Sequence, residues 1–409
     1  MFYNCANLNY INCLATDISA SNCTYNWVSG VASTGTFIKY PDMNSWTTGV
    51  NGIPTGWDIN EMRYVAFTAQ QDNSSIGLVQ LSTNQILEYS TDTTTWSLFD
   101  KDTNIALNNG DKVYVRGILS ADNTSSNNTQ FKMSGKIAAS GNCNALWNYE
   151  DLSAPLKAYC GYYMFYNCYS LTTAPELPAT TLANSCYTCM FKNCTSLTTA
   201  PELPATTLAS ECYTAMFDNC TSLTTAPELP ATTLAGWCYS NMFNRCSSLT
   251  QAPELPATTL AQCCYQKMFT WCTSLRQAPE LPATTLSGHC YAHMFDKCTS
   301  LRQAPELPAT TLANYCYWQM FYGCTSLRQA PVLPATTLVD YCYKEMFYGC
   351  SNLNYIKCLA TNRSATDCTD YWVSGVSSTG TFIKHLDMNN WITSYDGIPK
   401  GWTVVDAEI

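Results

Sequence analysis

A 26-residue repeat constrains the fold of this chain more than any other feature. The pair Met-Phe recurs at this spacing, with its methionine at Met164, Met190, Met216, Met242, Met268, Met294, Met320 and Met346. The register runs without an insertion from about residue 160 to residue 350. One unit is too short to bury its own apolar side chains, whereas stacked units share a continuous core. The sequence therefore predicts a solenoid.

Each unit contains two segments of different character. The first has the pattern C-Y-x-x-M-F-x-x-C, as in Cys186–Cys194, and its apolar residues fall at i, i+1, i+4, i+5 and i+8. This spacing makes one stripe on a helix, so we expect a helix here. The second segment, S-L-T-T-A-P-E-L-P in Ser196–Pro204, should be extended because Pro201 and Pro204 exclude a helix. The units thus predict an α+β fold class.

The motif F-x-x-C-x-x-L, followed by a short segment with proline, resembles the repeat of BspA-like leucine-rich-repeat surface proteins. The resemblance covers about residues 160–358, roughly half of the chain. It implies a leucine-rich-repeat solenoid with helices on one side and extended chain on the other. It also implies a role in adhesion and host contact, as for surface proteins of gut-associated bacteria and their phages. The unit here is longer than the family's usual repeat, and the stretch A-P-E-L-P-A-T-T-L accounts for the difference.

A second, longer repeat relates the two ends of the chain. Residues 1–60 match 346–405 without a gap at an offset of 345, and W-V-S-G-V begins at Trp27 and again at Trp372. We interpret this block as a cap that ends a repeat array, because terminal repeats must depart from the consensus. The start of the first copy would then be an assembly junction, for which the predicted residues are Met1, Phe2, Cys5 and Leu8. Tandem or head-to-tail assembly is one explanation, and a partial gene duplication is the other.

The segment between the first block and the repeats differs in composition from both. Alternating apolar residues in 63–69 and 112–118, and the turn sequence Asn-Gly-Asp at 109–111, predict short strands and a hairpin. We therefore divide the chain into an array-end cap (1–60), a β-sandwich domain (61–150), a leucine-rich-repeat solenoid (151–350) and a C-terminal cap (351–409). A spacer, a carbohydrate-binding module and a cap for the array all remain open as roles for the β domain, and we favour spacer and cap.

Composition limits the partners and the location of the protein. Charged residues make up 12% of the chain and the net charge is −10, which disfavours nucleic acid and anionic membranes as partners. No run of 18 apolar residues predicts a membrane-spanning helix, and we expect no membrane insertion. No signal peptide is visible at the N-terminus. The hydroxyl- and amide-rich composition favours an extracellular, cell-surface or virion-surface location, with an export signal outside this sequence or another export route.

The cysteines follow the repeat. Sixteen of the 24 form a series of pairs eight residues apart, from Cys160 and Cys168 to Cys342 and Cys350. Two helical positions eight apart lie about 12 Å from each other along the axis, too far for a disulfide. Buried free thiols are the favoured interpretation, and disulfides between stacked units are the alternative.

No sequence motif for catalysis is present. The histidines are His289, His293 and His385, and the first two have the i, i+4 spacing of metal ligands. They lack the glutamate of an H-E-x-x-H site and lie in variable columns of the repeat, so we expect them to be exposed surface residues. Nucleophile-elbow, P-loop and dinucleotide-binding patterns are missing as well. We expect a protein that is not an enzyme, with no cofactor and no metal.

Positions that vary between units carry the functional prediction. Three columns change in almost every unit, beginning at Ser185, Cys189 and Asn193, whereas exposed positions of the extended segment change far less. Random variation of residues that face solvent is the simplest explanation of these changes. Large aromatic side chains on a surface are typical binding anchors, which favours a recognition face. The predicted partner-binding residues are Trp237, Asn241, Arg245, Lys267, Trp271, His289, His293, Tyr315, Trp318, Tyr322, Tyr341 and Tyr348.

Two functions follow from these features. The first is a non-enzymatic extracellular adhesin or receptor-binding fibre that recognises a protein or a glycan on a surface. The second is a structural subunit of an extracellular filament, assembled head to tail or as a tandem polyprotein. The variable columns favour the first, and the repeated end block favours the second.

Overall fold

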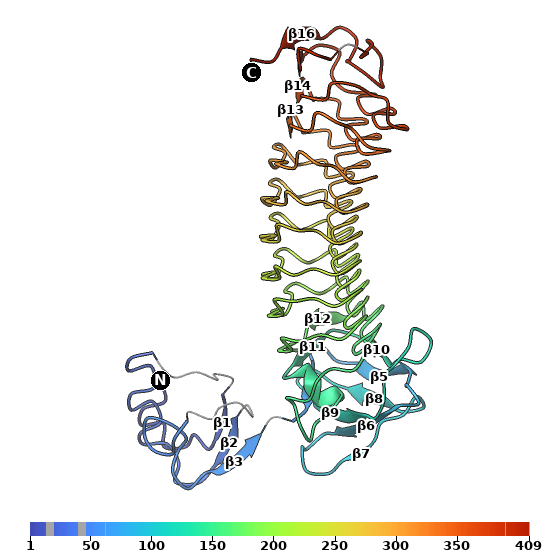
Figure 1. The fold of residues 1–409 in the computed structure, drawn as a ribbon. Coiled ribbons are helices and arrows are strands. Elements are labelled where there is room, and N and C mark those ends of the chain that lie inside the picture. The colour runs from blue at the N-terminus through green and yellow to red at the C-terminus, as the bar shows by residue number, and fades with distance from the viewer. Residues whose placement is uncertain (14–19, 40–45, 62, 389, 409) are drawn as a thin grey trace.

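The chain folds into a β-solenoid that rises from a β-rich base (Figure 1). The computed structural model describes all residues except 14–19, 40–45, 62, 389 and 409. The described residues contain no α-helix, and their one helical element is the 3-10 helix η1 (Cys143–Leu146). The predicted solenoid is confirmed, but the predicted α+β class is wrong because the expected helices do not form.

The segment predicted to be a helix is a chain of turns bonded to the next 26-residue coil. The Phe191 amide donates to the Met216 carbonyl at 2.9 Å, and the Asn193 amide donates to the Asp218 carbonyl at 2.8 Å. Amides of the alternate residues bond locally, as Cys194 does to the Phe191 carbonyl at 3.0 Å. A helix would instead satisfy every interior amide within its own segment. Bonding between coils therefore replaces bonding within a helix.

The alternation requires a left-handed backbone at particular residues. In one coil the amino acids with positive φ are Trp237 (63°), Asn241 (57°) and Arg245 (60°), and the equivalent positions of the other coils repeat this conformation. A residue other than glycine is destabilised by about 1–2 kcal/mol when its backbone is left-handed. The bonds to the next coil offset that cost. These left-handed positions are the same three columns that vary between units.

The core is built from columns of identical side chains. Phe191, Phe217 and Phe243 stack with ring centroids 5.7 Å apart and interplanar angles of 4° and 7°. A parallel column of buried tyrosines stacks at about the same spacing, with 5.9 Å between Tyr213 and Tyr239. Each coil adds one aromatic ring to each column, so the core has the same cross-section along the array.

The paired cysteines belong to this core as free thiols. All sixteen members of the series are buried and free, so the interpretation as buried thiols is confirmed. The Cys220 thiol donates to the Phe191 carbonyl at 3.1 Å, and Cys272 repeats the bond to Phe243 at 3.0 Å. A small apolar side chain with a weak donor suits this position, because the carbonyl that accepts the bond is buried too.

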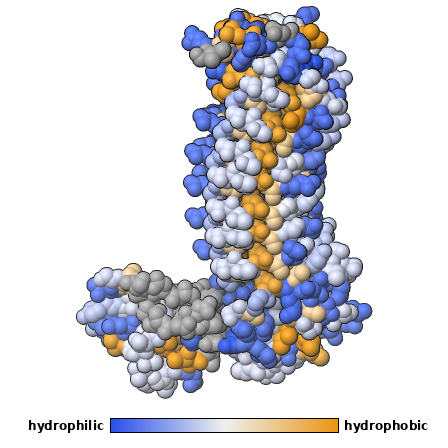
Figure 2. Space-filling model, in the orientation of Figure 1, coloured by the Kyte–Doolittle hydropathy of each residue, from blue (hydrophilic) through white to orange (hydrophobic). Residues whose placement is uncertain are grey.

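The proline segments form the opposite part of each coil. Short parallel bridges link neighbouring coils at Gln251, Gln277 and Gln303. Proline has no amide hydrogen, so the ladder is interrupted beyond these bridges. Partly exposed alanines recur once per coil against the core, as at Ala226, Ala252 and Ala278. On the face seen in Figure 2, apolar surface runs along the solenoid as a narrow stripe.

Two mainly antiparallel sheets lie at the start of the array, and one of them includes a strand of the first coil. One has the order β12-β11-β4-β9-β6-β7 and the other the order β10-β5-β8. The bounds of the first are β4 (Val65–Ala69), β6 (Gln85–Ser90), β7 (Ser97–Leu98), β9 (Lys112–Leu119), β11 (Ile137–Ser140) and β12 (Leu171–Thr173). The bounds of the second are β5 (Ser74–Gln80), β8 (Asn104–Leu107) and β10 (Gln130–Ser134). Apolar side chains of both sheets share one core with the repeats, and the limits 61–150 stay a prediction.

The first coil docks directly on these sheets. Strand β11 pairs in parallel with β12 of the first coil. Phe131 of β10 stacks on Phe165 at 5.2 Å, and Trp147 lies 5.8 Å from Tyr187, so aromatic rings cover the start of both core columns. The sheets therefore supply the surface on which the array begins.

A four-stranded parallel sheet ends the array. Its order is β13-β14-β15-β16, with bounds Gln329–Leu333, Tyr355–Cys358, Thr381–Lys384 and Thr403–Asp406. Trp372 covers both core columns, at 6.3 Å from Tyr343 and 6.1 Å from Phe347. Asp396 Oδ1 accepts the Tyr371 amide at 2.7 Å, where another coil would otherwise bond.

The first block has the same architecture as the last. Its parallel strands are β1 (Tyr10–Cys13), β2 (Thr36–Lys39) and β3 (Asp58–Glu61). The Trp27 indole donates to the Gly52 carbonyl at 2.8 Å, as the Trp372 indole does to Gly397 at 2.8 Å. The sequence duplication is thus also a duplication of structure.

Substitutions at Lys267, whose φ is 56°, distinguish these turns from a helix. We expect Lys267→Gly to be about 1 kcal/mol more stable than Lys267→Ala, because glycine adopts a left-handed backbone without strain. In a helix the order would reverse by about the same amount. Urea unfolding of both variants measures the difference. At the neighbouring Gln266, which is not left-handed, alanine should be the more stable replacement, and the same order at both sites would contradict the turn structure.

The buried thiols predict a loss of stability in alkali. Burial raises the pKa of Cys194, Cys220 and Cys298 well above that of a free thiol. Unfolded thiols ionise above pH about 8.5 while the folded ones stay protonated, so the free energy of unfolding should fall as the pH rises beyond that value. Urea midpoints between pH 7.5 and 10.5 in reductant measure it. In a Cys272→Ala/Cys298→Ala variant, the free energy of unfolding should fall less steeply with pH. In the control variant Cys5→Ala, which changes an exposed cysteine, it should fall as in the parent chain. A free energy of unfolding that does not change with pH in the parent chain would contradict the prediction.

Candidate functional site

The three variable columns define a surface that we call the variable face. It comprises the left-handed residues of each coil, such as 237, 241 and 245, and the residues between them. Amides of these residues bond to the next coil, as Trp237 does to Gln262 at 3.0 Å and Arg245 to Thr270 at 2.7 Å. The backbone is fixed by the ladder whatever side chain it carries. The face is thus a regular frame with changeable side chains.

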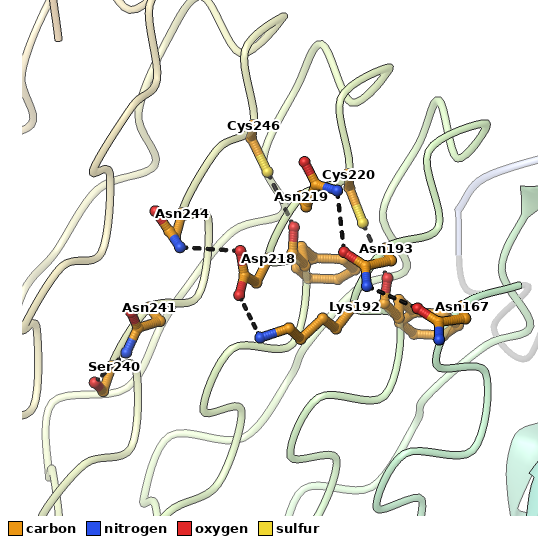
Figure 3. A network of polar contacts seen from close by, with 12 residues as sticks. Asn167, Lys192, Asn193, Asp218, Asn219, Cys220, Ser240, Asn241, Asn244 and Cys246 are labelled. Atoms are coloured by element: carbon orange, nitrogen blue, oxygen red, sulfur yellow. Dashed lines mark hydrogen bonds and ion pairs between the residues drawn. The ribbon is translucent and has the colours of Figure 1, made fainter. Parts of the chain in front are cut away.

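The first part of the variable face is a network of amides that satisfy one another (Figure 3). Asn219 donates to Asn193 at 3.0 Å, and Asn193 donates to Asn167 at 2.7 Å, one coil per step. Beside them, Asp218 forms an ion pair with Lys192 at 2.7 Å. Polar groups bonded in this way have less capacity to bind a partner, so this part of the face is chiefly structural.

The middle of the face presents large side chains to solvent. Trp237 and Trp271 are 42% and 47% exposed, and Arg245 is exposed as well. Asn241 and Lys267 are half-buried in the column between them. These five predicted residues therefore lie on one continuous stretch of surface, spread over two neighbouring coils.

The last part of the face is a stack of aromatic rings. Tyr315 lies between His289 and Tyr341, with centroid distances of 4.4 Å and 4.3 Å and nearly parallel planes. Trp318 packs edge-on against Tyr315 at 5.7 Å and against His293 at 4.5 Å. In a separate column Tyr322 stacks on Tyr348 at 4.8 Å. Five of the predicted residues thus meet in this stack, and two more form the separate tyrosine pair.

The histidine pair departs from its predicted exposure. His293 is 9% exposed and His289 is half-buried, so the expectation that both are exposed surface residues is wrong for His293. Trp318 packs edge-on against the His293 ring at 4.5 Å and covers it. Nδ1 of each histidine, Oδ1 of Asp296 and Nε1 of Trp318 are buried without a hydrogen-bond partner among the described residues. Burial is the main cause that lowers the pKa of His289, and electrostatic repulsion from the nearby His293 is the second cause.

Metal-binding geometry is missing from the described part of the chain. No group of three or more His, Cys, Asp or Glu side chains there is arranged to hold an ion. The histidine pair has Asp296 nearby, with its Oδ2 atom 3.6 Å from Nδ1 of His293. We assign these residues to the aromatic stack.

Sequence reasoning missed a groove along the proline segments. Three cavities of 470, 430 and 480 Å³ follow one another between coils, and each shares lining residues with the next. Pro253, Glu254 and Pro256 line two of them. The signal was present in the repeated prolines, which cannot continue the ladder and so leave the coils apart at this side. No variable-column residue lines these cavities.

The predicted junction residues lie at the start of the first block. Met1 is 94% exposed and Cys5 is exposed, whereas Phe2 and Leu8 are half-buried against the cluster around Trp27. Their equivalents in the last block are fully buried under the preceding coil. An assembly role for these residues stays a prediction.

Comparison with known proteins identifies the repeats. The profile described as the BspA type Leucine rich repeat region matches in six copies, over residues 158–278 and 262–371. Together these ranges span 158–371, just over half of the chain. No curated protein and no solved structure matches the chain.

The aromatic stack predicts a loss of stability in mild acid. Because the pKa of His289 is lowered by burial, the unfolded chain binds a proton at this residue more readily than the folded one. The free energy of unfolding should therefore decrease as the pH falls below about 6.5. Urea unfolding at pH 7 and pH 5 measures the decrease, which His289→Gln should reduce. The control His385→Gln should leave it unchanged, and an equal decrease in His289→Gln and the parent would contradict the prediction.

Proposed function

The chain belongs to the BspA-type leucine-rich-repeat family, and from this membership we propose that it is a non-enzymatic extracellular or cell-surface adhesin that binds its partner through the variable face. Repeats of this family form protein-interaction folds and are commonly surface-associated. The partner is a protein or a glycan on another surface. The proposal assigns no catalytic residue and no cofactor.

One observation carries the proposal. Trp237 and Trp271 remain 42% and 47% exposed on a backbone that is fixed by hydrogen bonds to the next coil. Large aromatic side chains are costly to leave in water and are enriched among residues that dominate binding energy. A rigid backbone also lowers the entropy that is lost on binding. These conditions favour recognition over drift on a solvated surface.

The proline segments supply the scaffold in this proposal. Their sequence is nearly constant, and the bridges at Gln251, Gln277 and Gln303 hold neighbouring coils in register. Constant contacts on one side leave the other side free to vary.

The part of the chain that the structure describes contains no helix that could span a membrane.

An adhesion assay tests the proposed function. Beads coated with the chain are added to a panel of immobilised matrix glycoproteins, polysaccharides and cells, and retention under flow is measured. We expect Trp237→Ala/Trp271→Ala to reduce retention about tenfold or more, because truncating an aromatic anchor costs about 2 kcal/mol or more.

A matched control separates the variable face from the scaffold. Thr224→Ala/Thr250→Ala changes two exposed residues of the constant segments in the same coils and should retain binding. Thermal unfolding verifies that every variant is folded. Equal retention by the tryptophan variant and the parent would contradict the proposal.

A further inference from the structure

We propose that Arg245, Lys267, Trp271 and Lys297 form a binding site for an acidic polysaccharide in the middle of the variable face. This inference rests on the proposed function and specifies its partner. The ligand would carry carboxylate or sulfate groups, recognised by the cations, on pyranose rings, recognised by the indole.

The backbone places three of these residues in one column. The Arg245 amide bonds to the Thr270 carbonyl and the Trp271 amide to the Asp296 carbonyl, both at 2.7 Å. Each bond joins one coil to the next, so Arg245, Trp271 and Lys297 follow each other at the spacing of paired strands, about 4.8 Å. Their φ angles of 60°, 62° and 60° give the three side chains the same backbone geometry. The indole thus has one cation on either side along the axis.

Lys267 adds a third positive charge in the adjacent column. It lies in the same coil as Trp271, four residues earlier, and its amide bonds to the Ala292 carbonyl at 2.9 Å. The site therefore consists of three cations around one exposed indole, within three successive coils. A linear polyanion that runs along the axis would meet all of them.

The local charge of the site opposes that of the whole chain. The chain has a net charge of −10, yet no ion pair to Arg245, Lys267 or Lys297 occurs among the described residues. Lys297 instead lies over the Tyr322 ring at 4.6 Å.

The neighbouring acids lie closest to other residues. Asp218 forms an ion pair with Lys192 at 2.7 Å, and Oδ2 of Asp296 lies 3.6 Å from Nδ1 of His293. Cations without a carboxylate partner are positioned to bind an external anion.

The shape of the site favours a sugar over an acidic peptide. Peptides are commonly held by pockets or by a free strand edge. The large cavities of the array lie between proline segments, and the amides of the variable face are engaged in the coil ladder. A pyranose ring needs a flat aromatic surface, and Trp271 provides one that is 47% exposed. Carboxylates and sulfates then receive charge-assisted hydrogen bonds from the cations.

Binding to dextran sulfate tests the proposal, with neutral dextran as a control of identical backbone. The intact chain is immobilised for biolayer interferometry, and polygalacturonate and poly-glutamate are measured in parallel. We expect dextran sulfate and polygalacturonate to bind, with an affinity that decreases as salt rises, and neutral dextran to remain unbound. A chain of charge −10 should repel a polyanion without such a site, so binding itself is informative.

Two variants and a charge-matched control locate the site. Arg245→Gln/Lys267→Gln should weaken binding about tenfold or more, since each charge-assisted bond contributes about 1.5 kcal/mol or more. Trp271→Ala should weaken polysaccharide binding by a similar factor. Lys101→Gln/Lys112→Gln removes the same charge from exposed residues before the array and should leave the affinity unchanged. Unfolding curves verify that all variants are folded.

The outcomes separate this inference from the proposed function. No binding of dextran sulfate or polygalacturonate, or equal weakening by the control variant, would overturn the polysaccharide site. Equal affinity for poly-glutamate, unaffected by Trp271→Ala, would also overturn it and indicate an acidic protein as partner. In either case adhesion that still depends on Trp237 and Trp271 would leave the proposed function standing. If the polysaccharides do not bind and adhesion does not depend on Trp237 and Trp271, the polysaccharide site and the proposed function are both refuted.

Discussion

Hydrogen bonds between successive coils are the interaction on which the rest of this structure depends. Alternate amides of each turn segment donate to the next coil, as Phe191 does to Met216 at 2.9 Å. The bonds set the coil spacing at which the phenylalanine and tyrosine rings stack in the core. They also impose the left-handed backbone at the variable positions. Core, backbone strain and surface frame thus have one common cause.

This arrangement separates stability from recognition. Identical residues such as Phe191 and Phe217 face inward and make the same contact in every coil. Left-handed positions face the variable side, where the backbone bond is independent of the side chain. The cost of a non-glycine residue there, about 1–2 kcal/mol, is tolerated because the ladder contributes in every coil. Tryptophan, arginine, lysine and histidine all occupy such positions in this chain.

The sequence predicted what depends on periodicity and missed what depends on neighbouring coils. The unit length, the solenoid and the buried thiols followed from the repeat itself. The helix was wrong because apolar residues at i, i+1, i+4 and i+5 fit both a helix and a series of alternating turns. The distinction rests on bonds to the next coil, which one unit does not reveal. For the same reason the burial of His293 and the cavities beside Pro253 were not anticipated.

Because the coils of the array are stacked at a constant spacing, distances along the variable face can change in steps of one coil. Adding or deleting one unit would move two surface residues apart or together by a single coil spacing, about 4.8 Å, without altering any contact inside a coil. Recombination between units could therefore change the distance between Arg245 and the aromatic stack in fixed steps. Point substitutions could change the groups themselves. Spacing and chemistry would then evolve as two independent variables on one invariant frame.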